Sequence, residues 1–371
     1  MTTPEIITLI KPGSRIAIAV GSRGIRNLST IVRAVGNCIK KANGIPFIVP
    51  AMGSHGGGTT DGQKQILASM GIVEDLIGIP VLATMDVIQI GQTDDGVPVY
   101  MDKNAYQADM IVLINRIKPH TDFIGDFESG LCKMMAIGLG KHIGCSRLHQ
   151  EGFENFHNLI PSVAKVFLKK ANIGFGVAIL ENAYDQTYQI KAIKANKIMT
   201  EEPKLLKKAK QLMPRIMVPE IDVLIIEKIG KDISGAGMDT NIIGRTTKGP
   251  MLGFNGPTIQ QIIILDLTYA SHGNACGVGL ANFITKSMYD KIDHVSTYAN
   301  VIASGNPNAG RIPVIMNTEK EAIVAATRCC SQIDITNPRI VRILDTLHLE
   351  TIWVSEKIYN EINSNTQIEL C

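Results

Sequence analysis

The chain has 371 residues, of which 45 % are hydrophobic and 19 % are charged, and its formal net charge is +3. This composition is that of a folded globular protein, and the length predicts two domains rather than one. The near-neutral charge and the 5 % of aromatic residues argue against a nucleic-acid partner, because such a partner needs basic patches and stacking side chains.

Cysteine usage and hydropathy indicate a protein of the reducing cytoplasm. The seven cysteines are odd in number and form no Cys-x-x-Cys pair, so we expect neither a disulfide framework nor an iron–sulfur cluster. The N-terminal stretch lacks the apolar core of a signal peptide. No apolar run reaches the roughly 18 residues of a membrane span. We therefore expect a cytoplasmic protein without a membrane partner.

Short apolar runs alternate with helical stretches along the chain. In chain order, the pattern predicts a strand over 15–20, a helix over 27–42, a strand over 46–51, a helix within 59–70, strands over 109–116 and 174–181, a charged amphipathic helix within 201–220, and strands over 222–230 and 262–267. Strands of Val, Ile and Ala separated by helices are typical of parallel sheets covered on both faces. The predicted fold class is therefore α/β, with two α/β domains and largely parallel sheets.

A domain boundary is predicted near residue 216. The helix within 201–220 runs into two prolines, and the strand pattern restarts at 222. We expect an N-terminal cofactor and catalytic domain over 1–215, a smaller C-terminal substrate domain over 216–371, and an active-site cleft between them. Ligands of open α/β sheets collect at the carboxyl ends of the strands, so the loops that follow strands are where functional side chains are expected.

Four of these loops carry polar side chains. They supply, in chain order, Arg23 and Arg26, then His55, then His120, then the second-domain group Asp239, Asn241 and Arg245. Each also has a simpler interpretation: a surface turn, a flexible glycine-rich loop or a strand end. The gathering of four such loops favours a functional site over four unrelated surface positions.

The segment 120–149 concentrates the strongest candidates, His120, Lys133 and His149. Two nucleotide-binding motifs are excluded. The stretch "GLGKH" within this segment lacks the first glycine and the Ser or Thr of a P-loop, and the stretch "GSHGGG" around His55 does not match G-x-G-x-x-G. A zinc metallohydrolase built on His55, His120 and His149 is an alternative. It lacks a close His spacing and gives Lys133 no part.

These motifs resemble the lactate racemase family, whose members use a nickel-pincer nucleotide. That family carries a His in a Gly-Thr-His loop, a His after a proline, a Lys in a Ser-Gly-x-x-Lys stretch and a His sixteen residues further on. The matching stretches here are "GSH", "KPH", "ESGLCK" and the end of "CSRLH", which contain His55, His120, Lys133 and His149. The second-domain stretch "MDTN" resembles the family's Leu-Asp-x-Asn segment.

The resemblance implies catalytic roles for two of these histidines and for an arginine. His55 and His120 would move the hydroxyl proton of a 2-hydroxy acid, each for one enantiomer, while hydride leaves C2. An arginine would hold the carboxylate, with Arg23 the first candidate and Arg26 the second. The family's first loop also carries an acidic residue that "GSRGIR" lacks.

The resemblance also implies how the cofactor is held. Lys133 would carry the nickel-pincer nucleotide covalently, with Ser129 and Gly130 beside it, and Lys141 is the next candidate if Lys133 is not the tether. His149 would ligate the nickel. The interval between the second His and the Lys is three residues longer than in the family. Protein made without the cofactor maturation enzymes, which are expected partners, would lack the cofactor.

The substrate-binding candidates are Asp239, Asn241, Arg245 and Lys248, because the family's Gln and Lys in this region have no match. Arg245 predicts a polar substrate, such as a dicarboxylic hydroxy acid or an aldonic acid, rather than lactate. The sequence thus predicts an isomerase, a racemase or epimerase of a 2-hydroxy acid, and it is compatible with a homo-oligomer. An alternative of another class is a non-catalytic protein that binds nickel or the nucleotide cofactor.

Overall fold

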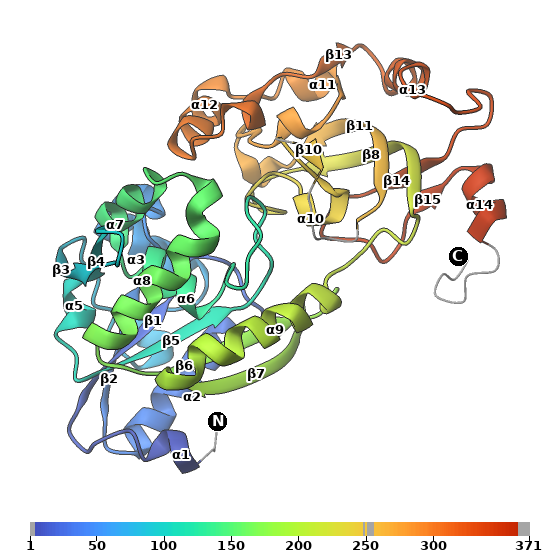
Figure 1. Ribbon diagram of the computed structural model, residues 1–371. Coiled ribbons are helices and arrows are strands. Elements are labelled where there is room, and N and C mark those ends of the chain that lie inside the picture. Colours follow the sequence, from blue (N-terminus) through green and yellow to red (C-terminus); the bar gives the residue numbers. More distant parts are fainter. Residues whose placement is uncertain (1–3, 248, 251–255, 363–371) are drawn as a thin grey trace. The chain divides into compact units, whose positions relative to one another are not determined.

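A computed structural model describes residues 4–247, 249–250 and 256–362 of the chain. The chain divides into two compact units, Met1–Met213 and Pro214–Cys371 (Figure 1), beside the boundary expected near residue 216. Each unit contains a mostly parallel sheet with helices, so the predicted α/β fold class is confirmed. Within the described residues, no helix combines the length and the apolar character that crossing a membrane would require.

Unit 1 is built on a five-stranded sheet of order β2-β1-β5-β6-β7. Its strands are β1 (Arg15–Val20), β2 (Ile45–Pro50), β5 (Met110–Arg116), β6 (Ile173–Glu181) and β7 (Thr187–Lys194). The first four are parallel, as their continuous apolar runs predict, and β7 is antiparallel to β6 at the edge. The sequence did not predict β7, because an edge strand exposed on one face lacks the continuous apolar run of a buried one.

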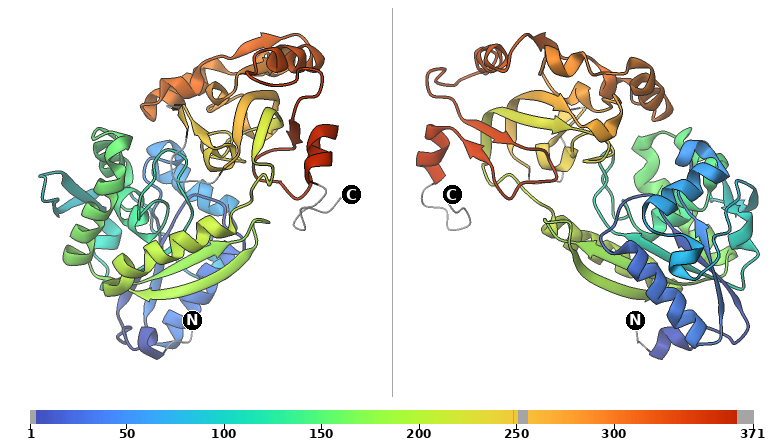
Figure 2. Two further views of the ribbon diagram at one scale, coloured as in Figure 1. Left: turned by 45° about the vertical axis from the view of Figure 1, so that its right-hand side comes forward. Right: turned by 180° about the vertical axis from the view of Figure 1, so that it is seen from behind.

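Both faces of this sheet are buried because successive side chains point to opposite sides. Ala17 and Ala19 pack into a core shared with α8 (Phe156–Lys170) and α9 (Ile198–Leu212). Ile16 and Ile18 pack into a second core on the other face, shared with α2 (Leu28–Lys41). Helices on both faces are visible in the two views of Figure 2.

The remaining elements of unit 1 are short. They are α1 (Pro4–Ile7), α3 (Thr60–Ser69), α4 (Glu74–Ile77), α5 (Lys103–Tyr106), α6 (Leu131–Lys133), a π-helical turn (Met134–Gly138), α7 (Lys141–His149), and a hairpin of β3 (Val87–Gln92) and β4 (Pro98–Asp102). The hairpin was not predicted, since β3 is only partly buried and carries a register shift near Gly91.

Unit 2 contains a six-stranded sheet of order β13-β12-β11-β8-β14-β15, parallel except for the last pair. Its strands are β8 (Glu220–Ile229), β11 (Thr258–Leu267), β12 (Phe283–Thr285), β13 (Val314–Met316), β14 (Ile340–Ile343) and β15 (Trp353–Val354), beside the two-residue pair β9 (Arg245–Thr246) and β10 (Gly249–Pro250). Its helices are α10 (Thr240–Ile243), α11 (Lys286–Tyr289), α12 (His294–Ala303), α13 (Glu319–Arg328) and α14 (Glu356–Ile362).

Candidate functional site

The carboxyl ends of β1, β2 and β5 lie at one edge of the unit 1 sheet, because the three strands are parallel neighbours. The loops after β1 and β2 are joined there by a hydrogen bond between Ser22 Oγ and His55 Nδ1. His55 precedes a tight turn, Gly56–Gly58, in which all three glycines have positive φ. A Cβ on Gly56 would lie 2.5 Å from the carbonyl carbon of Gly62. The glycines therefore form a compact turn that presents His55 at the sheet edge.

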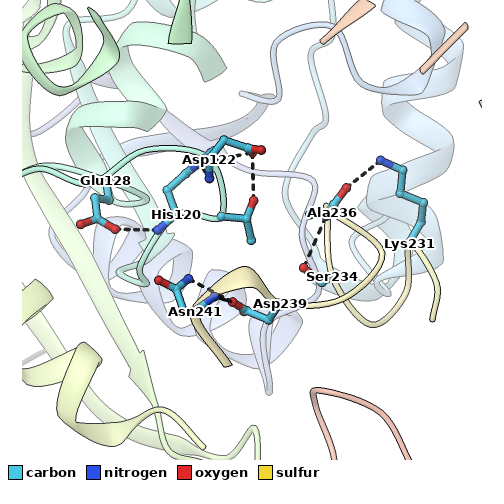
Figure 3. Close-up of polar contacts among 10 residues, drawn as sticks. His120, Asp122, Glu128, Lys231, Ser234, Ala236, Asp239 and Asn241 are labelled. Atoms are coloured by element: carbon cyan, nitrogen blue, oxygen red, sulfur yellow. Dashed lines mark hydrogen bonds and ion pairs between the residues drawn. The ribbon is translucent and has the colours of Figure 1, made fainter. Parts of the chain in front are cut away.

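The loop after β5 is closed at its base and braced from within. Lys118 and Ser129 exchange two backbone hydrogen bonds of 2.9 and 3.1 Å. Inside the loop, the buried Glu128 carboxylate accepts a hydrogen bond from His120 N at 2.7 Å (Figure 3). It also accepts one from Gly125 N at 3.2 Å. Lys210 Nζ of α9 pairs with the same carboxylate at 2.6 Å. Glu128 thus fixes the backbone that carries His120.

The His120 ring is oriented by its neighbours and held neutral. Asp122 N donates to Nδ1 at 3.1 Å, and the ring stacks on Phe123 with centroids 4.4 Å apart. Burial lowers the pKa of His120 well below its usual value, and the charges of Lys133, Arg23 and His149 lower it further. His120 therefore lies within electrostatic range of Lys133, Arg23 and His149.

Lys133 ends the three-residue helix α6 and is followed by the π-helical turn. The buried carboxylate of Glu202, from α9, accepts a hydrogen bond from Cys132 N at 3.1 Å. Gly130 lets this carboxylate approach, since a Cβ there would lie 2.2 Å from Glu202 Oε1. Burial, followed by the charge of Arg23, lowers the pKa of Lys133 to about 8. The amine is thus closer to its neutral, nucleophilic form than an exposed lysine would be.

His149 ends α7 with one ring nitrogen fixed. Its Nδ1 lies 2.7 Å from Cys145 O and 3.4 Å from Cys145 Sγ. The contact with the carbonyl places the ring hydrogen on Nδ1, which leaves the lone pair on Nε2, as in metal-binding histidines oriented by a backbone carbonyl. Burial lowers the pKa of His149, but the hydrogen bonds with Cys145 outweigh burial and raise it.

A row of aromatic rings connects the two histidines of this segment. Phe123, which stacks on His120, meets Phe156 edge-on at 5.6 Å between centroids. Phe156 in turn lies 5.2 Å from the His149 ring. The separation of the two imidazoles is therefore set by packed rings of fixed size.

The two candidate arginines differ in position. The Arg23 side chain is reached by solvent, but most of its surroundings are protein. This partial burial and the charge of Arg116 lower the pKa of Arg23. The charge of Arg23 in turn lowers the pKa of His120 and of Lys133. Arg26 is held through its backbone, whose N–H donates to Glu181 Oε1 at 2.6 Å. Arg23 thus lies within electrostatic range of His120 and Lys133.

In unit 2, the predicted substrate residues Asp239 and Asn241 hold a helix start. Asp239 Oδ1 accepts hydrogen bonds from Asn241 N and Asn241 Nδ2, both at 3.0 Å (Figure 3), and so caps α10. Asp239 N donates to Thr346 Oγ1 at 2.8 Å, and both Asp239 and Asn241 are buried. Their polar atoms stabilise this local fold.

Arg245 is engaged by the unit 2 sheet. Its guanidinium donates to Ile259 O, to Gln260 O at 3.3 Å and to Asn282 Oδ1 at 3.1 Å. Ile259 and Gln260 lie at the amino-terminal end of β11, the opposite end from the carboxyl edge where ligands of such sheets bind. Lys248, the other predicted cation, lies outside the described residues.

Comparison with known proteins gives a family match that lies within unit 1. Residues 1–158 match the family described as lactate racemase N-terminal domain. The match covers 158 of the 371 residues, all of them in unit 1. The lactate racemase apoprotein from Thermoanaerobacterium thermosaccharolyticum shares the fold with a TM-score of 0.57 and 15 % identity, over 92 % of this chain and 87 % of that one. No curated protein matches the sequence. The resemblance predicted from the motifs is confirmed.

The matched residues 1–158 contain every unit 1 candidate, from Arg23 to His149. Among the described residues, no group of three or more His, Cys, Asp or Glu side chains is arranged to hold a metal ion. A single imidazole beside a half-buried lysine fits a cofactor that brings its own donor atoms to the metal.

Two carboxylates of the site were not predicted. Glu128 lies within the matched residues 1–158, and Glu202 follows them on α9. Glu202 is nearly inaccessible, and burial raises its pKa to about 7. The only sequence signal for Glu128 was its place between two site residues in "DFESG", and Glu202 gave none within a charged helix.

Proposed function

We propose that this protein is a nickel-pincer nucleotide-dependent racemase or epimerase of a 2-hydroxy acid. The observation that carries the proposal is the electrostatic cluster of Arg23, His120, Lys133 and His149 at the carboxyl edge of the unit 1 sheet. The lactate racemase N-terminal domain family, matched over residues 1–158, supports a racemase or epimerase.

The residues present fit the cofactor. Lys133 would carry it, since its amine, with a pKa of about 8, is available for covalent attachment near neutral pH. Ser129 and Gly130 immediately precede α6, so they would lie beside the attachment point. His149 would offer Nε2 to the nickel, because Nδ1 is held at Cys145 O. When bound, the cofactor would supply the acceptor for a hydride leaving C2 of the substrate.

The other side chains would handle the substrate. Arg23 would hold its carboxylate, since a guanidinium matches that group with two parallel hydrogen bonds. His55 and His120 would take up the hydroxyl proton, one for each enantiomer, and return it in the reverse direction. The lowered pKa of His120 keeps the ring neutral near pH 7, which is the state that can accept a proton. Such proton transfer is worth ~10²–10⁴-fold in rate.

The proposed substrate class is a 2-hydroxy acid without a further preference. The prediction of a polar substrate rested on Arg245, whose donors contact Ile259, Gln260 and Asn282. Because these contacts use donors of the Arg245 guanidinium, fewer donors remain for a substrate than the sequence predicted. Lactate, malate, 2-hydroxyglutarate and gluconate therefore enter the test as equals.

The test is co-expression with the cofactor maturation enzymes, followed by intact-mass spectrometry, nickel analysis and racemisation assays on these four acids. A mass increment, about one nickel per chain, as expected for a single site, and turnover of at least one acid are expected. Protein that gains neither the mass increment nor nickel would overturn the proposal. Replacement of the exposed His142 by Ala serves as a matched control and should change nothing.

A second candidate function is a non-catalytic carrier of the cofactor. It is favoured by the engagement of Asp239, Asn241 and Arg245 in the fold of unit 2. A carrier would show the mass increment and the nickel but would turn over none of the four acids, so the same experiment separates the two functions.

A further inference from the structure

Lys141 is fully buried, although it lies in the segment that links Lys133 to His149. Its backbone adopts a φ of 55°, in the left-handed region that non-glycine residues rarely enter. A lysine in this position is costly unless its ammonium group is well partnered. The groups that contact the Lys141 ammonium should therefore explain why the fold keeps a strained backbone and a buried charge at this position.

Three groups surround the ammonium of Lys141. Nζ donates to Pro50 O, at the end of β2, at 2.8 Å and to Gln63 Oε1 at 2.5 Å. Asp102 Oδ2 lies 3.5 Å away, and the same carboxylate caps α5 through Oδ1, which accepts from Ala105 N at 2.9 Å. Asp102 and Gln63 are also buried. The lysine thus joins β2, α3 and β4 inside unit 1.

Gln63 connects Lys141 to the loop that carries His55. Its side-chain Nε2 donates to Gly53 O at 2.8 Å and to His55 O at 3.3 Å. Only an amide can accept from Lys141 on one atom and donate to two carbonyls on the other. A continuous buried path therefore runs from Asp102 through Lys141 and Gln63 to the backbone of His55.

The same path reaches the segment that carries the other site residues. Lys141 begins α7, which ends at His149, and Gly138 O of the preceding π-helical turn accepts from Gly53 N at 3.1 Å. The His55 loop and the Lys133–His149 segment are thus connected through one set of buried bonds. A shift of either part would break several of them.

We propose that Gln63 and Lys141 are positioning residues that fix His55 relative to Lys133 and His149. The inference depends on the proposed function only for the catalytic part of His55, and not for its position. It also removes Lys141 as an alternative tether, because its ammonium already has three buried partners.

The test is Gln63→Glu in the full chain, made without the cofactor. The carboxylate keeps the acceptor for Lys141 but loses both donors and faces two carbonyl oxygens. Amide hydrogen exchange in the 53–59 loop should become roughly tenfold or more faster, and the NMR signals of the His55 ring should move. Gln65→Glu makes the same charge change at an exposed position of α3 and should leave both unchanged. Unaltered exchange and signals in Gln63→Glu would overturn the proposal.

A second variant guards against misfolding of the first. The pair Lys141→Met and Asp102→Asn removes both charges together and retains an acceptor to cap α5. It should show the same loosening of the 53–59 loop, and an unchanged loop would contradict the proposal. In cofactor-loaded protein, Gln63→Glu should lower kcat with little change in KM. Loosening of the loop in a protein whose wild type has no turnover would retain the positioning role and reject only the enzyme.

Discussion

The segment 120–149 of unit 1 and the segment 239–245 of unit 2 gave similar sequence signals, but the fold uses them differently. In the first, backbone groups and buried carboxylates orient His120, Lys133 and His149, and the charges of Lys133 and His149 lower the pKa of His120. In the second, Asp239 caps a helix and Arg245 contacts the carbonyls at the start of β11. Polar residues after a strand therefore indicate a site only when their polar atoms are not all used in hydrogen bonds that hold the fold.

The largest effect expected from this contrast is at Lys133. Lys133→Ala should abolish the covalent mass increment and all racemisation in protein co-expressed with the maturation enzymes. Intact-mass spectrometry measures the first and chiral chromatography the second. Lys141→Met combined with Asp102→Asn should keep the increment, and a loss of the adduct in that double variant alone would reverse the assignment.

His120 should be next in size. His120→Asn should reduce racemisation by ~10²–10⁴-fold, because proton transfer is lost while binding groups remain. The nickel content should stay at its wild-type level, which separates this role from that of His149. His157→Asn, an exposed histidine at the start of α8, is the control, and equal losses in the two variants would argue against a specific part for His120.

Glu202 should give unit 1 a distinctive pH dependence of stability. The folded carboxyl has a pKa of about 7 against 4.5 unfolded, so between these values the folded state holds one more proton. The contribution is complete below about pH 4.5 and is lost as the pH rises to about 7, by ~1.4 kcal/mol per pH unit and ~3 kcal/mol in total.

Glu202→Gln should remove this dependence, which urea unfolding between pH 4.5 and 8 can measure as the difference from the wild type. Glu154→Gln, at an exposed position, is the matched control. A difference between wild type and Glu202→Gln that is constant with pH would contradict the raised pKa.

The smallest effect is expected at Arg245. Arg245→Lys should destabilise unit 2 by ~1–3 kcal/mol, since the planar donors that reach Gln260 O and Asn282 Oδ1 are lost. The preference among the four acids should not change. Arg311→Lys, at an exposed position, is the control, and a switch in substrate preference with unchanged stability would return Arg245 to the substrate site.

Much of the fold could be predicted, because buried parallel strands such as 15–20 and 109–116 are written as continuous apolar runs. Strands with one exposed face, such as β7, carry a weaker pattern and were missed. The sequence predicts His120, Lys133 and His149 as site residues because they share a motif with a known family.

The groups that support these side chains could not be predicted from the chain alone. Glu128 pairs with Lys210, and Glu202 accepts from Cys132, across separations that only the folded chain brings together. The contacts of Arg245 could not be predicted for the same reason. Nothing in the sequence indicates that the carbonyls of Ile259 and Gln260 will take its donors.

The π-helical turn at Met134–Gly138 has an angular consequence. On a straight α-helix, residues sixteen apart would point about 160° away from each other and lie about 24 Å apart along the axis. In this protein, by contrast, Lys133 lies close enough to His149 for its charge to act on the pKa of the imidazole. The wide turn and the left-handed backbone of Lys141 therefore redirect the chain between them. The length of this sixteen-residue segment therefore sets the direction in which His149 points. Deletion of one residue would turn its imidazole away from the amine of Lys133.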